Sequence, residues 1–139
     1  MIQGVLTTGA LPVLERLVQF TARRHEVLTD NIANLSTPYF KPRDLDPATF
    51  QAALREAIDT RRRRPNPTSG LLPADRTELP LPGAAEGGHH QGILFHDQNN
   101  RDLERIMQSL AENTMVHNAT VQMIRNQFDM LRMAIRERL

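Results

Sequence analysis

The chain has 139 residues, a formal net charge of +1, no cysteine and no tryptophan, and only 4% of its residues are aromatic. This length allows one domain or two small ones, and the near-neutral charge argues against strong global attraction to nucleic acid or to an anionic membrane. The absence of cysteine excludes a disulfide scaffold and a thiolate metal site. With few aromatic side chains to fill a core, we expect a marginally stable chain that gains order from partners.

The first predicted helix begins near Pro12 and ends near Leu35. Proline is tolerated in a first helical turn, and the Thr37-Pro38 pair stops the helix because a residue before proline is pushed out of the α region. Apolar residues in this helix alternate at spacings of three and four, which is the a/d seam of a coiled coil. The seam consists of Leu11, Leu14, Val18, Leu28, Ile32 and Leu35.

The apolar start of the chain does not have the pattern of a targeting segment. It lacks a basic region before the apolar run and carries Glu15 and Arg16 within it. We therefore expect neither a cleaved signal peptide nor a membrane span there.

A short second helix is predicted after Asp46, which can cap it, with Pro47 in the first helical position. It should end in the arginine run at 61–64. Residues 65–98 are rich in proline and glycine and lack helical or alternating periodicity, so we expect a flexible loop. A small β element at 92–95 is the weaker alternative.

The last predicted helix opens after Asn99 or Asn100, either of which can cap it, and continues toward the end of the chain. It has the same alternation of three and four. Its seam consists of Leu103, Met107, Leu110, Val121, Ile124, Phe128, Leu131 and Ile135.

Both seams are interrupted by a polar layer, formed by Thr21 and His25 in the first helix and by Thr114 and His117 in the last. Buried polar residues of this kind fix the register of paired helices at some cost in stability. The sequence predicts an all-α fold in which the two terminal helices pair as a coiled coil and the middle loops out. The predicted units are 1–36 and 99–139 for the coiled-coil helices, 37–64 for a turn and short helix, and 65–98 for the loop.

Each terminal helix carries a second apolar stripe at a seven-residue repeat, far around the helix from its seam. A solitary coiled coil would place polar residues there. Chance or packing within the chain is one interpretation, and a contact with neighbouring subunits is the one that we favour. The second stripe consists of Val13, Phe20, Val27, Val116, Met123 and Met130.

The sequence offers no assembled catalytic chemistry, so an assembly component is favoured over an enzyme. It contains no cysteine nucleophile, nucleophile elbow, phosphate-binding glycine loop or paired-histidine zinc motif. The cluster of His89, His90, His96 and Asp97 lacks a regular ligand spacing, and we predict no metal and no cofactor. The arginines at 61–64 are the best argument for nucleic-acid binding, but a solvated helix end is the default interpretation.

One segment resembles the N-I-A-N-x-x-T-P signature of flagellar rod and hook axial proteins. The matching residues are Asn31, Ile32, Ala33, Asn34, Thr37 and Pro38. The following Lys41-Pro42-Arg43-Asp44, and the last helix from Asp102 to Thr114, are similar to segments of the proximal rod members of that family. The resemblance covers both terminal thirds. The family usually has glycine after the signature proline, where this chain has Tyr39.

The resemblance implies a structural subunit of the bacterial flagellar basal-body rod. Such a subunit would be exported unfolded by the flagellar type III apparatus without a cleaved signal peptide. It would polymerise in the periplasm with itself and other rod proteins, above the export gate, the MS ring and its rod adaptor. No nucleic-acid partner and no direct lipid binding are implied. The alternatives are a nucleic-acid-binding helical protein that uses residues 61–64 and a soluble coiled-coil adaptor.

Overall fold

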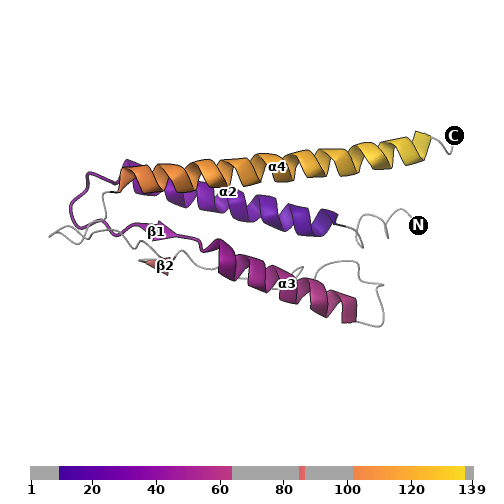
Figure 1. The fold of residues 1–139 in the computed structure, drawn as a ribbon, viewed down its shortest axis with the longest axis horizontal. Coiled ribbons are helices and arrows are strands. Elements are labelled where there is room, and N and C mark those ends of the chain that lie inside the picture. The colour runs from indigo at the N-terminus through magenta and orange to yellow at the C-terminus, as the bar shows by residue number, and fades with distance from the viewer. Residues whose placement is uncertain (1–9, 64–84, 87–101, 137–139) are drawn as a thin grey trace.

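The computed structural model describes residues 10–63, 85–86 and 102–136. Two long helices, α2 (Leu11–Ala33) and α4 (Leu103–Arg136), lie side by side and run in opposite directions (Figure 1). A third helix, α3 (Pro47–Arg63), packs on the side of α2 that faces away from α4. The all-α prediction is confirmed, and the two terminal helices are in contact. Coiled-coil geometry in that contact stays a prediction.

Helix α2 begins where its proline allows. Pro12 occupies the first turn, and the carbonyl of Ala10 accepts hydrogen bonds from the amides of Val13 and Leu14. The helix ends at Ala33, two residues before the predicted end at Leu35. Turn bonds such as Thr37 N–H to the carbonyl of Asn34, 2.9 Å long, then replace the helical ladder.

Helix α3 is capped by Asp46, as predicted. Its carboxylate accepts hydrogen bonds from the amides of Ala48 at 3.0 Å and Thr49 at 3.2 Å, which satisfies two donors of the first turn. Helix α4 is capped by Asp102, which accepts a bond from the amide of Arg105. The prediction of Asn99 or Asn100 as the cap is therefore wrong, because Asp102 directly precedes the first helical residue and its carboxylate reaches the first turn.

A small hydrophobic core lies between α2 and α3. Phe20 stacks on Phe50, with ring centroids 4.0 Å apart and planes inclined by 8°. Leu45 and Leu54 complete this buried cluster. Each such side chain contributes about 1.5–3 kcal/mol when fully buried, so the cluster fastens α3 to α2.

Two short strands form the only β pairing in the described part of the chain. In β1 (Arg43–Asp44) and β2 (Ala85–Glu86), which are antiparallel, Arg43 lies opposite Glu86 and Asp44 opposite Ala85. Two residues of the predicted loop at 65–98, Ala85 and Glu86, thus pair with the main chain of β1, and the rest of that segment lies outside the described residues. The alternative β element at 92–95 lies outside the described residues.

Candidate functional site: a helix pair and its signature turn

The contact between α2 and α4 is built around buried polar groups. The side-chain amide of Asn113 donates a 2.9 Å hydrogen bond to the backbone carbonyl of Thr21, and both residues are buried. The hydroxyl of Thr21 lies 2.9 Å from Nδ1 of His117. A polar layer at Thr21 and His117 is therefore confirmed. Because these bonds join only one pairing of positions, they favour a single register of the two helices.

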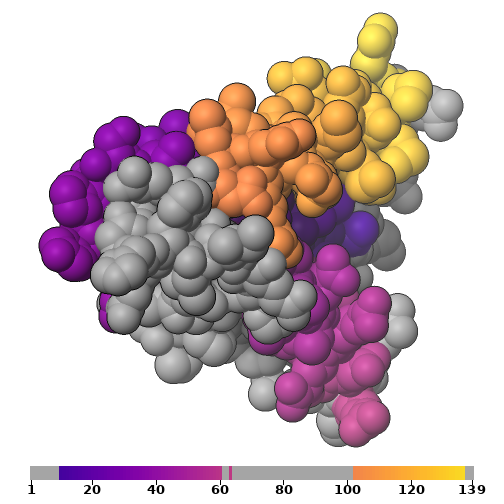
Figure 2. All heavy atoms as spheres, turned by 60° about the vertical axis from the view of Figure 1, so that its left-hand side comes forward, coloured from indigo at the N-terminus to yellow at the C-terminus, as the bar shows by residue number. Residues whose placement is uncertain are grey.

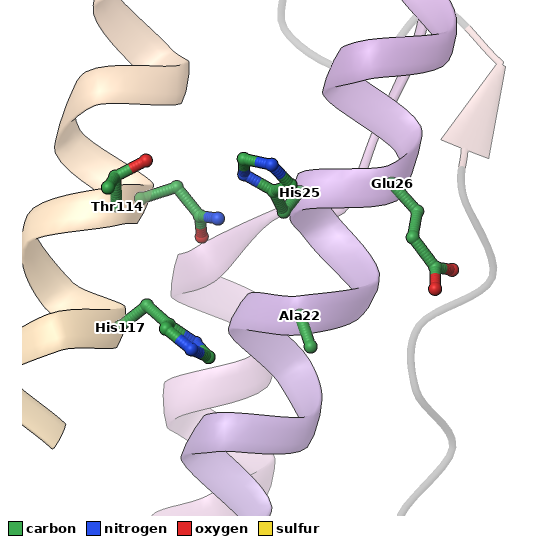
Figure 3. A pocket seen from close by; sticks show the side chains of 6 residues that line it. Ala22, His25, Glu26, Thr114 and His117 are labelled. Carbon is green, nitrogen blue, oxygen red and sulfur yellow. The ribbon is translucent and has the colours of Figure 1, made fainter. Parts of the chain in front are cut away.

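The other predicted members of the polar layer, His25 and Thr114, are exposed. They line a groove of about 350 Å³ between the two helices together with His117. Figure 3 shows His25 and His117 projecting from opposite helices into this space, while Glu26 points away from α4. The described residues contain no group of three histidine or acidic side chains that could hold a metal ion.

The face of α4 that packs on α2 differs from the predicted seam. Its buried residues are Ile106, Asn113 and Thr120, each seven residues after the last. The residues one position later, Met107, Thr114 and Val121, are less buried, and Met107 is 51% exposed. Half of the eight predicted seam residues of α4 are half-buried, namely Leu110, Val121, Ile124 and Leu131. Counting apolar residues alone missed this face because two of its three buried residues are polar.

The predicted seam residues at the ends of α4 are exposed. Leu103, Phe128 and Ile135 are 45%, 45% and 52% exposed. Since Thr21 is level with Asn113 and His117, the start of α2 at Leu11 lies roughly level with residue 125 at equal helical rise. The last turns of α4 therefore extend past the first residue of α2, as Figure 1 shows.

The seam of α2 is covered more evenly. Leu28 is fully buried, at 0% exposure. The remaining predicted seam residues of this helix are half-buried: Leu11, Leu14, Val18, Ile32 and Leu35.

The second stripe has different surroundings on the two helices. On α2, Phe20 is buried in the core with α3, and Val13 and Val27 pack against the same cluster. Phe20 is therefore covered within the subunit, whereas a contact of the half-buried Val13 and Val27 with a neighbouring subunit stays a prediction. Sequence reasoning treated α3 as a separate element and left the stripe without a partner.

On α4 the second stripe is open to solvent in this structure. Val116, Met123 and Met130 are 45%, 54% and 50% exposed. At about 100° per residue, the charged residues between 113 and 136 all fall on the opposite side of the helix. These charged residues are Arg125, Asp129, Arg132 and Arg136. The stripe is thus an uncharged apolar surface on an otherwise solvated face.

The signature turn is fastened to α2 by two sets of side-chain bonds. The amide of Asn31 donates to the backbone carbonyl of Arg43, and its oxygen accepts from the backbone amide of Arg43 at 3.0 Å. Arg24 forms two parallel bonds to the carboxylate of Asp44, at 2.9 and 2.8 Å. Both charged side chains are largely buried, 10% and 16% exposed. These bonds hold the segment after the turn in an extended path along α2.

Only part of the predicted signature is buried. Asn31 is 2% exposed, and Ile32 and Asn34 are half-buried, whereas Ala33, Thr37 and Pro38 are exposed. The amide of Asn34 donates to the carbonyl of Asp30 within the last turn of α2. The first asparagine therefore holds the following strand, and the second closes the helix end.

Two proteins of known family are similar in sequence to this chain. The flagellar basal body rod protein FlgB of Borrelia hermsii is 30% identical over 118 residues, covering 78% of this chain and 82% of that protein. The protein of the same name from Yersinia enterocolitica is 28% identical over 114 residues, covering 77% and 79%. The chain belongs to the FlgB family. No family profile and no solved structure matches it.

Within this FlgB-family chain, the structure explains why the two motif segments occur together. Asn31 of the N-I-A-N segment and Asp44 of the K-x-R-D segment both hold β1 to α2, the latter through Arg24. Arg24 was missed by sequence reasoning. It precedes Asn31 by seven residues and so lies on the same face of α2. This spacing was the one feature of the sequence that could have indicated its role.

Tyr39 occupies the place where the FlgB-like signature usually has glycine. Its backbone has a φ of 61°, in the left-handed region, and its side chain is 81% exposed. A side chain with a Cβ costs roughly 1–2 kcal/mol in that conformation. The turn therefore keeps the backbone shape that suits glycine even though glycine is absent.

Among the described residues, no helix combines the length and the apolar character needed to cross a lipid bilayer.

Proposed function

We propose that this chain is a structural subunit of the flagellar basal-body rod that assembles through the exposed stripe of α4. The FlgB relatives support the rod, and their name describes a component of the basal body. The observation that carries the assembly surface is the row Val116, Met123 and Met130, which is apolar and exposed and has no charged residue on its side of the helix from 116 to 130. Exposed apolar rows of this kind usually mark protein contacts.

The helix pair supplies a rigid support for this surface. Helix α4 has 34 residues, about 50 Å at 1.5 Å per residue, and α2 holds it through the polar layer. A stiff helix with one side packed and another side apolar suits stacking with similar helices. In this proposal the subunit is exported by the flagellar type III apparatus without a cleaved signal, and it joins other rod proteins in the periplasm near the export gate and the MS-ring adaptor.

The proposal is tested by replacing Met123 with serine in cells that lack their own copy. We expect export and helical content to be unchanged, while rod assembly and swimming decline, because each copy loses about 1.5–3 kcal/mol of buried contact. Asn118→Ser is the control, since Asn118 is exposed on the same helix and lies on the side opposite the stripe. Normal swimming with Met123→Ser and with Val116→Ser would contradict the proposed surface.

A further inference from the structure

The segment after the signature turn exposes every second side chain. Tyr39, Lys41 and Arg43 are exposed, while the alternating residues Phe40, Pro42 and Asp44 are buried or half-buried. From Phe40 on, this alternation is that of extended backbone, in which successive side chains point to opposite sides, and Tyr39 stands in the turn that precedes it. We name Tyr39, Lys41 and Arg43 the cation row.

Two features show that the cation row is not explained by packing within the described chain. Tyr39 keeps its positive φ at an energetic cost, yet its side chain is 81% exposed. Among residues 10–63 and 102–136, the side chains of Lys41 and Arg43 form no ion pair, and Arg43 lies opposite Glu86 in the β pairing. Backbone strain that is held in place without a local gain is a reason to look for a function.

The first turns of α4 carry a surface of complementary chemistry. Glu104, Gln108, Glu112 and Met115 follow one another at spacings of four, four and three, so they share one helical face, and all are exposed. Met115 is 71% exposed. Arg105 is the one basic residue between 103 and 115, and it lies at the edge of this face. We name the four residues the acidic face.

The two surfaces are opposite in charge. At 3.3 Å per residue the Cα atoms of Lys41 and Arg43 lie about 7 Å apart, and at 1.5 Å per residue those of Glu104 and Glu112 lie about 12 Å apart, a difference that these long side chains can span. Each surface has two charges and one residue suited to a sulfur–aromatic contact, Tyr39 on one and Met115 on the other. Both begin at the same end of the helix pair, from which the acidic face reaches Met115, level with Thr21. Figure 2 turns that end forward and shows the purple turn segment beside the orange start of α4.

We infer that the cation row of one copy docks on the acidic face of a second copy, an inference that rests on the proposed assembly function. Because the two surfaces are different patches of one chain, the contact is heterologous. It leaves the acidic face of the first copy and the cation row of the second copy free. Such contacts continue from copy to copy. Since both patches begin at one end of the molecule, the contact places neighbouring copies at a similar level.

The test uses two charge-reversed forms of the purified full chain. Lys41→Glu with Arg43→Glu reverses the cation row, and Glu104→Lys with Glu112→Lys reverses the acidic face. Each form alone should self-associate about tenfold or more weakly than the unchanged chain in sedimentation velocity, because like charges meet across the contact. An equimolar mixture should recover association to within about threefold, since each reversed patch then finds an opposite charge.

Arg55→Glu with Arg63→Glu is the matched control, because it makes the same change in net charge on exposed residues of α3 as the reversed cation row makes after the turn. This form should associate as the unchanged chain does. Equal weakening of the control, or a mixture no better than its components, would overturn the inference. So would an unchanged chain that stays monomeric at about 1 mM.

Two further measurements distinguish a contact between copies from binding to an anionic surface and from loss of folding. If the reversed cation row loses binding to duplex DNA or to vesicles with anionic lipid, and mixing restores nothing, the row serves an anionic surface and the inference is rejected. Circular dichroism of every form checks that helical content is retained. The proposed function is tested separately by Met123→Ser in cells, so a failed docking test leaves that result standing.

Discussion

At the scale of single residues, the molecule depends on a few buried polar side chains with specific partners. Arg24 and Asp44 form a two-bond ion pair in which each side chain is less than a fifth exposed. Asn31 uses both ends of its amide on the main chain of Arg43. Burying any of these groups without its partner costs free energy. The pairs therefore favour the one arrangement of β1 on α2 in which every group is bonded.

Replacing Arg24 with methionine should lower the free energy of unfolding by about 3 kcal/mol, because the Asp44 carboxylate is left buried without its partner. Urea unfolding followed by circular dichroism measures this loss. The control is Arg23→Met, where the lost pair with Glu26 is more than half exposed and should contribute little. Equal effects of the two substitutions would show that burial of the pair is unimportant.

Replacing Tyr39 with glycine should raise the free energy of unfolding by about 0.5–1 kcal/mol. Glycine adopts positive φ without the steric cost of a Cβ, although it gains more entropy in the unfolded chain. Tyr39→Ala keeps the Cβ and should give no such gain. Thermal unfolding of the three proteins compares them, and a gain with alanine would assign the effect to the exposed ring.

At the scale of elements, the contact between α2 and α4 combines an apolar position with a polar layer. Leu28 is fully buried in α2, while Thr21, Asn113 and His117 form the hydrogen-bonded layer between the two helices. The apolar residues supply the stabilisation, and the polar layer selects the register. A charge introduced at either kind of position should separate the helices.

Leu28→Asp should abolish the pairing of α2 with α4, because it buries an unpaired charge at a fully covered site. Ile124→Asp should weaken it less, since Ile124 is only half-buried. Gln122→Asp, on an exposed position of α4, is the control. Helical content by circular dichroism and protection from protease report the pairing, and full helicity with Leu28→Asp would refute this assignment of the contact.

The sequence was sufficient for the starts of α2 and α3, because Pro12, Asp46 and Pro47 act locally through their own backbone and side chains. It was insufficient for the face of α4, where Asn113 and Thr120 are buried. A polar residue becomes favourable in a contact only when a partner satisfies it, and that partner lies in a distant segment. Pattern counting cannot detect such a partner.

At the scale of the whole molecule, the described chain is a row of three helices with α2 in the middle (Figure 1). Both sides of α2 are therefore occupied, one by α4 and the other by β1 and α3. Among the described residues, helix α4 has only one packed side. This asymmetry explains why the second stripe is internal on α2 and open on α4.

Phe20→Ser should therefore destabilise the isolated subunit by about 3–5 kcal/mol, since it removes a stacked ring from the core. Met123→Ser should leave the free energy of unfolding within about 0.5 kcal/mol of the unchanged chain, as an exposed position does. Urea unfolding of the two variants gives the comparison. A Phe20→Ser subunit as stable as the unchanged chain would instead favour a contact of this residue with a neighbouring subunit.

The hydrogen bonds made by α2 join residues that are near in sequence on one side of the helix and distant on the other, and this difference affects the order of folding. The bonds to β1 join residues 12 and 20 positions apart, whereas those to α4 join residues 92 and 96 apart. Closing the longer loop costs more entropy, so α2, β1 and α3 should form a unit before α4 docks. Hydrogen exchange should then show α4 amides opening while α2 and α3 stay protected. Helix α4, which presents the apolar stripe, would therefore be the last element to dock during folding and the first to detach during unfolding.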